Sequence, residues 1–341
     1  MKVIVYPQII SIDNVCTNPY LADVVRSLEM SGVHIGNRPD KNPLFSLIFK
    51  RIDNDAYIFH WLENVPNYKH GILQTIAAIY FVGRIKCHRK TLVWFLHNKE
   101  PHVMRHPFLS KMIVRLLLRK ADLIVTHSTD GIELICREYP PAVSRILFTP
   151  HPTKNRIRLR PDADTSQTDL LIWGSISPYK GVLEFARFAA MRQLMLRIKI
   201  IGRCTSPELW NELMQYAGPS LTMENRAITF DELADEIGKA RFVLIPYDDK
   251  SVLDSSALMD SLSFGAKVIG PDTGAFKDYA SEPLICVYTF RSFDDIPVIV
   301  QRETCPANMD DYRHFLDKYN WKAFGKLFSE RLHAISTRAS V

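Results

Sequence analysis

The sequence is poor in cysteine, and no cysteine stands where a metal site or a disulfide framework would need it. Its six cysteines are scattered along 341 residues, with no C-x-x-C pair and no histidine at metal-ligand spacing. This usage excludes a disulfide-rich secreted domain and predicts a reducing, cytoplasmic location. The first ten residues are charged and then apolar, but no small-residue cleavage site follows, so we expect a first strand there and not a signal peptide.

Long apolar runs and nucleic-acid signatures are lacking as well. The longest nearly uncharged apolar stretch, residues 71–83, has 13 residues, too few to cross a bilayer. No helix-turn-helix, zinc-finger or single-strand-binding pattern accompanies the basic residues, so we expect no nucleic acid partner. The composition is 47% apolar and 23% charged, which is ordinary for a folded soluble protein, and the length suits two domains.

Acidic residues are scarce only in the first half of the chain. Residues 1–160 contain 23 lysines and arginines against 12 acidic residues, whereas residues 161–341 contain 20 against 25. In the basic half, residues 105–120 add apolar side chains at helical spacing, namely Phe108, Met112, Ile113, Leu116 and Leu117. Such a helix can lie on an anionic membrane surface, or it can pack on the core with a solvated basic face. Both interpretations stay open.

Apolar strands alternate with longer periodic segments through the whole chain. In the first half we expect strands at residues 3–6, 57–60, 92–96, 123–126 and 145–148. In the second half we expect strands at 170–173, 196–201, 242–246 and 267–270, and helices at 180–190, 207–216 and 231–238. This alternation predicts an α/β fold of two Rossmann-like, doubly wound domains, each with a parallel sheet covered on both faces.

The polar stretch at residues 153–168 interrupts the alternation and is typical of a connection between domains. We therefore expect an N-terminal domain at 1–155, a second domain at 156–310 and C-terminal helices at 311–341, whose early part packs back on the first domain. Ligands of open α/β sheets bind beyond the carboxyl ends of the strands, so we expect the two domains to face each other across a cleft.

One segment of the second domain has the pattern of an anion site. Residues 242–278 read FVLIPYDDKSVLDSSALMDSLSFGAKVIGPDTGAFKD, which is a strand, a polar loop, a helix that begins near Ser255 and Ser256, and another strand. The first N–H groups of a helix lack intrahelical partners and the helix dipole is positive there, so this start can hold a nucleotide diphosphate. The simpler alternative is that Asp254, Ser255 or Ser256 only caps the helix.

A second turn of this kind precedes the first by some 75 residues. The stretch WGSISPYKGVLEF places Gly174 and Ser175 after a strand, and Lys180 at or just before a helix start. Lysine is a compact, mobile point charge that suits a phosphate, although a surface lysine in a loop would have the same local sequence. Two anion-competent turns in one domain favour a diphosphate site more than either turn alone.

Together these motifs resemble GT-B glycosyltransferases, in particular family 4 (glycosyl transferases group 1) and its bacterial capsule and exopolysaccharide enzymes. The resemblance covers nearly the whole chain. In the second half it rests on GSISPYKG at 174–181, IPYDD at 245–249, DSSALMDSLSFGAKVIGPDTGAF at 254–276 and YNW at 319–321. In the first half it rests on FHWLEN at 59–64, WFLHN with PH at 94–102 and PHP at 150–152.

The resemblance implies an acceptor-binding first domain and a donor-binding second domain. Lys180 would bind the donor diphosphate, Ser255 and Ser256 the distal phosphate, and Asp260 the ribose hydroxyls. The remaining donor-binding residues that it implies are Gly174, Ser175, Arg203, Tyr247 and Gly274, the last of them in a loop that lines the sugar.

In the first domain the resemblance implies the catalytic residues His97, Glu63 and Glu100. His97 stands at the end of a strand, where the family places a histidine facing the transferred sugar; a histidine packed in the core is the alternative. Glu63 and Glu100 also follow strand ends. One of them is the expected general base if the enzyme inverts, because direct displacement requires the acceptor hydroxyl to lose its proton.

Three departures from the family pattern leave retention or inversion of configuration open. Of the family's paired glutamates, the first falls at Val252 and the second is the shorter Asp260. The basic residue after the first donor-loop glycine is replaced by Ser175, for which Arg203 is a candidate substitute. The glycine-rich loop after the first strand is also missing.

We therefore expect transfer of a sugar from a UDP- or GDP-sugar to a saccharide or polyprenyl-diphosphate-linked acceptor in bacterial surface polysaccharide synthesis, at the inner membrane face. No covalent cofactor and no metal are expected, since Asp248 and Asp249 follow a strand where the resemblance places donor-proximal backbone. The alternatives are a related inverting β-glycosyltransferase, a phosphorylase or sugar-nucleotide epimerase, or a catalytically silent nucleotide-sugar binding protein.

Overall fold

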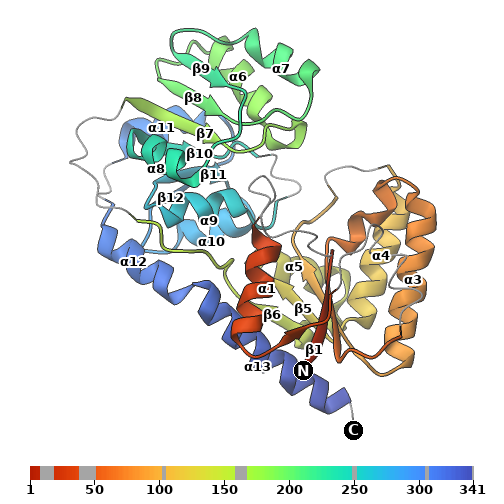
Figure 1. Cartoon of the computed structure of the whole chain (residues 1–341). Helices are drawn as coiled ribbons and strands as arrows, with labels where there is room; N and C mark the ends of the chain where they lie inside the picture. The colour runs from red at the N-terminus through yellow and green to blue at the C-terminus, as the bar shows by residue number, and fades with distance from the viewer. Residues whose placement is uncertain are drawn as a thin grey trace. The chain divides into compact units, whose positions relative to one another are not determined.

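The computed structural model describes residues 1–7, 19–37, 51–101, 105–157, 167–247, 252–303 and 307–339. The chain divides into two compact units, unit 1 at 1–150 with 321–341, and unit 2 at 151–320. Each unit contains one six-stranded parallel sheet with helices packed on it (Figure 1). The predicted α/β class with two Rossmann-like domains is confirmed.

Unit 1 has the strand order β2-β1-β3-β4-β5-β6. Its strands are β1 (Lys2–Tyr6), β2 (His34–Ile35), β3 (Ala56–His60), β4 (Thr91–Leu96), β5 (Leu123–Thr126) and β6 (Ile146–Phe148). Its α-helices are α1 (Tyr20–Met30), α3 (Gly71–Cys87), α4 (Pro107–Lys120), α5 (Thr129–Glu138) and α13 (Trp321–Ala339), with 3-10 turns η1 (Leu62–Asn67) and η2 (Pro140–Arg145).

Alternation along the buried strands of unit 1 sends side chains to both faces of the sheet. On one face, Val93 and Phe95 of β4 share a core cluster with residues of α1 and α13. On the other face, Tyr57 and Phe59 of β3 meet the ring of Phe81 from α3. The same sheet therefore carries α1 with α13 on one side and α3 on the other.

The C-terminal helices divide between the two units. The helix that covers unit 1 is α13, which packs so closely on α1 that a Cβ at Gly325 would overlap the carbonyl oxygen of Ser27. The preceding helix, α12 (Met309–Lys318), belongs to unit 2, where Tyr312 donates to the carbonyl of Ala266 and accepts from the amide of Cys286. We expected the early part of the C-terminal helices to pack on the first domain, but it is the later helix, α13, that covers unit 1. The unit boundaries fall at 150/151 and 320/321.

The basic helix α4 is packed on the core through its apolar side. Ile113 and Leu117 are fully buried, while Lys111 and Arg115 point to solvent. For residues 105–120 we expected either a helix on a membrane surface or a helix packed on the core with a solvated basic face, and the packing of α4 is that of the second. Phe108 departs from it, because this side chain in the first turn is 75% exposed. Within the described residues no helix is long and apolar enough to span a membrane.

Unit 2 has the strand order β12-β11-β10-β7-β8-β9. Its strands are β7 (Thr168–Trp173), β8 (Ile198–Ile201), β9 (Leu221–Glu224), β10 (Ala240–Leu244), β11 (Val268–Pro271) and β12 (Val287–Phe290). Its other α-helices are α6 (Val182–Met191), α7 (Pro207–Met214), α8 (Phe230–Gly238), α9 (Ser256–Ser263), α10 (Gly274–Ala280) and α11 (Asp295–Arg302), with the 3-10 turn η4 (Pro178–Lys180). The strand order reverses direction between β7 and β10, and open α/β sheets bind ligands at such a point.

Candidate functional site

A pocket lies in unit 2 at the carboxyl ends of β7, β8 and β10, at this reversal of strand order. Its lining includes Gly174, Ser175, Lys180, Tyr247 and Ala257. The first four were predicted as donor-binding residues, and Ala257 lies in the first turn of α9, directly after Ser255 and Ser256. The pocket thus joins the two turns that the sequence marked as anion-competent.

The turn between β7 and α6 holds Lys180 over the pocket. Its backbone is closed by Lys180 N–H donating to the carbonyl of Ser177 at 3.0 Å, and the next residue, Gly181, has φ +66°. A Cβ at Gly181 would overlap the carbonyl oxygen of Pro246, two residues after the end of β10. Only glycine allows this approach, so the geometry of the turn requires Gly181 directly after Lys180.

The Lys180 ammonium is held by polar and aromatic neighbours. Its Nζ donates to Ser175 Oγ at 3.0 Å and lies 5.6 Å from the centroid of the Tyr247 ring. Burial acts to lower the pKa of Lys180, but the phenols of Tyr247 and Tyr179 outweigh it and the net direction is upward. Lys180 therefore stays charged at neutral pH, and among the described residues no carboxylate forms an ion pair with it.

The loop after β8 runs beside the turn after β7. Ile176 N–H donates to the carbonyl of Arg203 at 2.9 Å, and Thr205 N–H donates back to the carbonyl of Ile176 at 2.9 Å. These bonds bring Arg203 next to the Gly174–Ser175 segment, with its side chain exposed. The predicted substitution of Arg203 for a basic residue at Ser175 is therefore compatible with the backbone path.

The start of α9 is capped by the buried Ser255. Its Oγ accepts from the amide of Leu258 at 3.2 Å, so the simpler capping interpretation applies to this residue. Ser256 follows as the first helical residue and is partly exposed. Gly274 opens α10 close by, where Ala275 N–H donates to the carbonyl of Leu253 at 2.8 Å. The Ser255 hydroxyl is therefore already used as the helix cap. Phosphate binding by the start of α9 stays a prediction.

Asp260 is already engaged by an arginine that sequence reasoning missed. Its carboxylate lies 3.1 Å from the guanidinium of Arg156, which also donates to Ser263 Oγ at 2.8 Å and stacks on the Phe230 ring at 4.2 Å. Both charged side chains are mostly buried. A ribose hydroxyl would therefore meet a carboxylate whose first partner is Arg156, a residue of the expected linker.

Three buried histidines gather at the carboxyl edge of unit 1. They stand at or just after the ends of consecutive strands: His60 on β3, His97 after β4 and His127 after β5. The Nδ1 atom of His60 is 2.9 Å from Nε2 of His97. The His60 ring stacks on Phe95 at 4.2 Å and the His97 ring stacks on Trp61 at 4.7 Å. Of the three, only His97 was predicted as a functional residue.

The hydrogen bonds assign the protons of this histidine cluster. Burial first, and then the neighbouring His97 and His127, hold the pKa of His60 well below its ordinary value, so His60 is neutral. Its Nε2 atom has no partner among the described residues. A buried N–H without a partner is costly, so we assign the hydrogen to Nδ1, which donates to His97 Nε2. His97, which accepts at Nε2 in this arrangement, then has its hydrogen on Nδ1 and is a donor there.

The two candidate bases differ in environment. Glu63 is buried in η1, where its Oε2 accepts from Trp94 Nε1 at 3.1 Å and its Oε1 has no partner among the described residues. Burial raises the pKa of Glu63, which suits a general acid or base better than an ordinary carboxyl. Glu100 is exposed. Asp248, Asp249 and His102 lie outside the described residues.

No family model matches the chain, and no curated protein matches it by sequence. Solved structures match over nearly the full length. AviGT4, a glycosyltransferase involved in avilamycin A biosynthesis, is 15% identical over 98% of both chains, with a TM-score of 0.62. HepE of Anabaena, solved with UDP-glucose, is 13% identical over 100% of this chain and 98% of that one, with a TM-score of 0.60.

A third similar structure is WaaB, a lipopolysaccharide outer core galactosyltransferase. It is 13% identical over 98% of this chain and 99% of that one, with a TM-score of 0.65. At such identities the likeness establishes the fold, so the chain has the GT-B fold of two Rossmann-like units. The predicted resemblance to GT-B glycosyltransferases is confirmed at this level, and the finer assignment to family 4 stays a prediction.

Proposed function

We propose that the chain is a glycosyltransferase that uses a UDP- or GDP-linked sugar as its donor. The observation that carries the proposal is the charged Lys180 in a pocket at the strand reversal of unit 2. A ligand with a diphosphate suits this lysine and the helix start beside it. The shared fold gives further support, since HepE was solved with UDP-glucose.

In this proposal unit 2 stabilises the nucleoside diphosphate as it leaves. Lys180 and the first N–H groups of α9 would neutralise the charge that develops on the leaving phosphate, which is usually the largest catalytic contribution of a fixed site. Ser256 and the Gly274 turn would line the phosphate and sugar, and Asp260 would share its carboxylate between Arg156 and the ribose. No metal or covalent cofactor has a role in this step.

Unit 1 would bind the acceptor and supply the remaining polar groups. His97 would donate a hydrogen bond through Nδ1 to the transferred sugar, with its tautomer held by His60. If the reaction inverts configuration, Glu63 is favoured over Glu100 as the general base, because its raised pKa and its oxygen without a described partner suit proton transfer. A reaction that retains the configuration of the transferred sugar would need no such base. The proposed function covers both stereochemical outcomes.

The acceptor that we propose is a saccharide or a polyprenyl-diphosphate-linked saccharide of bacterial surface polysaccharide synthesis, in the manner of a family 4 enzyme. The proposal places the reaction at the cytoplasmic face of the membrane. The similarity to WaaB, a galactosyltransferase of lipopolysaccharide, supports this acceptor class.

Val252 favours a second candidate function, a catalytically silent nucleotide-sugar binding protein. It stands where the resemblance expects the first of two glutamates, yet its side chain is buried in the core of unit 2. A site without that carboxylate could bind the donor without turning it over. Binding of UDP or GDP with no transfer to any acceptor and no donor hydrolysis would support this second function.

The test is the variant Lys180→Ala. Removal of a charge-assisted hydrogen bond costs roughly 1.5–3 kcal/mol, so we expect UDP or GDP affinity to fall about 13- to 160-fold and sugar transfer to fall further. Lys239→Ala is the matched control, because Lys239 precedes β10 at the amino edge of the same sheet. Unchanged nucleotide affinity and transfer in Lys180→Ala would refute the donor site.

A further inference from the structure

An apolar stripe runs along the solvent side of α3 in unit 1. Leu73, Ile76 and Tyr80 recur at helical spacing and are 58%, 59% and 55% exposed. The opposite side of the helix is apolar too, since Phe81 and Ile85 are buried in the core. A helix with apolar residues on both sides is expected to have a second apolar contact beyond its own core.

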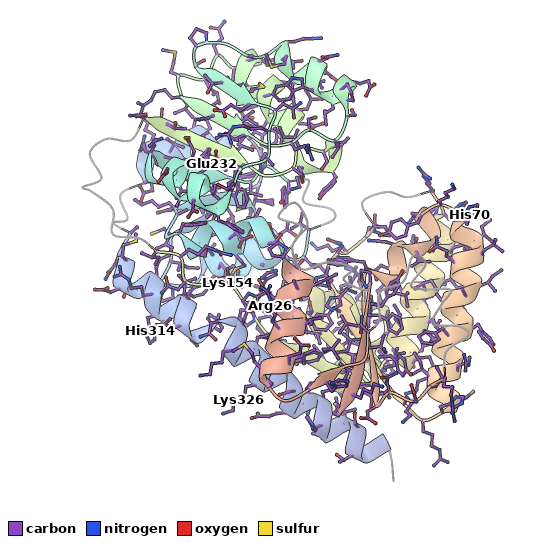
Figure 2. The ribbon with its side chains drawn as sticks, viewed as in Figure 1. Arg26, His70, Lys154, Glu232, His314 and Lys326 are labelled. Atoms are coloured by element: carbon purple, nitrogen blue, oxygen red, sulfur yellow. The ribbon has the colours of Figure 1, made fainter. Side chains whose placement is uncertain are left out.

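Neighbouring side chains extend this stripe into a surface. Tyr68 and Ile72 are exposed near the start of α3, as is Phe108 in the first turn of α4. The helices α3 and α4 pack side by side on one face of the unit 1 sheet (Figure 1). Figure 2 marks His70, directly before α3, on this part of unit 1. We call the exposed sides of these two helices the α3–α4 face.

The segment that forms this face is strongly basic, although Lys86, Lys90 and Lys99 pair with acidic residues outside it. Residues 64–121 contain eleven lysines and arginines and a single acidic residue, Glu100. Lys111, Arg115, Arg119 and Lys120 are exposed along α4. No ion pair of these four side chains is found among the described residues. The basic excess of the first half of the chain is therefore concentrated in the segment that also exposes the apolar stripe.

The positive charge and the exposed apolar side chains of the α3–α4 face together indicate which kind of partner it binds. A second copy of the chain docked face to face by two-fold symmetry would bring two basic surfaces together. An anionic bilayer instead matches the charge and accepts apolar side chains at its interface. We propose that the α3–α4 face docks the protein on an anionic membrane, with Leu73, Ile76, Tyr80 and Phe108 entering the interface and the basic side chains of α4 contacting the headgroups.

This inference differs from the sequence-based one, in which the apolar side of α4 itself would enter the membrane. That side is buried in unit 1, so α4 contributes charge while α3 and Phe108 contribute the apolar contact. The docking extends the proposed function, on which the choice of a lipid surface partly rests. Vesicle binding requires no sugar transfer, so the docking and the proposed reaction can fail separately.

The test is sedimentation of the full chain with vesicles of phosphatidylcholine, alone or mixed with phosphatidylglycerol. The wild type is expected to bind the mixed vesicles, less strongly as salt rises. Lys111→Glu with Arg115→Glu should weaken binding at least about 30-fold, from about 1 kcal/mol for each basic residue at the surface. Leu73→Asp with Ile76→Asp should weaken it by at least a similar factor, because both side chains leave the apolar interface.

Matched controls separate the face from general effects of charge and polarity. Met191→Asp with Met195→Asp changes side chains of unit 2 that are 78% and 96% exposed. Lys322→Glu with Lys326→Glu reverses charges on the exposed side of α13, where Figure 2 marks Lys326. Both controls should bind vesicles like the wild type. Equal binding to neutral and anionic vesicles, wild-type binding by the Leu73/Ile76 variant, or a dimer that this variant dissociates would overturn the proposal.

Discussion

Acidification should weaken the fold of unit 1 through His60. This imidazole is fully buried and donates to His97 Nε2 at 2.9 Å, while burial and the neighbouring histidines hold its pKa well below the ordinary value. In the unfolded chain the same imidazole has an ordinary pKa of about 6.5. Below that pH the unfolded chain binds a proton at this imidazole and the folded protein does not. The free energy of unfolding therefore decreases as the pH is lowered.

The size of the effect follows from linkage. One proton bound only by the unfolded state changes the free energy of unfolding by about 1.36 kcal/mol per pH unit. Between pH 6.5, where the unfolded imidazole is half protonated, and pH 5, His60 alone should therefore cost about 1.6 kcal/mol of stability. The loss ends only when the pH reaches the folded pKa. His60→Asn keeps a donor for His97 but cannot take up a proton, so its penalty relative to the wild type should shrink by that amount over the same range.

The assay is urea unfolding of the wild type and His60→Asn at several pH values, with hydrogen exchange of the β3 and β4 amides to assign the effect to unit 1. The lost ring stacking on Phe95 makes the variant less stable at every pH, and the informative quantity is the slope. His314→Asn, on the exposed side of α12, controls for loss of a surface imidazole. A difference between His60→Asn and wild type that is constant from pH 7 to pH 5 would refute the reasoning.

Three further variants test individual contacts. The folded pKa of Glu63 is raised, so its stabilising contribution is lost as pH rises through that value; Glu63→Gln should gain stability relative to wild type from pH 4 to pH 7 in urea unfolding, and a loss would contradict the assignment. Gly181→Ala should cost at least about 2 kcal/mol from its positive φ and its overlap with the Pro246 carbonyl, and should weaken UDP or GDP binding in calorimetry. Gly238→Ala, which meets open space, should do neither. Asp260→Asn should lower thermal stability without nucleotide by about 1–3 kcal/mol, because its arginine partner loses an ion pair; unchanged stability would leave only a ribose role.

Most of the fold could be predicted because local patterns specify it. The strand expected at 123–126 has the same bounds as β5. The strands expected at 57–60 and 92–96 correspond to β3 and β4, which begin one residue earlier than predicted. Fully buried parallel strands are continuous apolar runs, which are easy to recognise. The short strands β2, β9 and β12 were missed, since two to four residues at a sheet edge have too little pattern to separate them from loops.

The candidate site was predictable where one turn contains all its parts. Gly174, Ser175 and Lys180 lie within eight residues, and the structure brings them together because the turn between β7 and α6 is local. The partners of Asp260 and His97 could not be found in this way. Arg156 lies 104 residues from Asp260 and His60 lies 37 residues from His97. Such pairs depend on which strands are neighbours, although a histidine at the end of three consecutive strands was a visible signal.

The carboxyl edges of the two sheets differ in electrostatic character, and this difference supports the roles proposed for the two units. In unit 2, Lys180 keeps its charge at neutral pH, and the start of α9 adds the positive end of a dipole. In unit 1, burial keeps His60 neutral and raises the pKa of Glu63. An edge with fixed positive charge suits a ligand that is already anionic, such as a diphosphate. An edge of neutral, hydrogen-bonded groups suits a sugar hydroxyl, because it can donate or accept a proton without first losing a counterion.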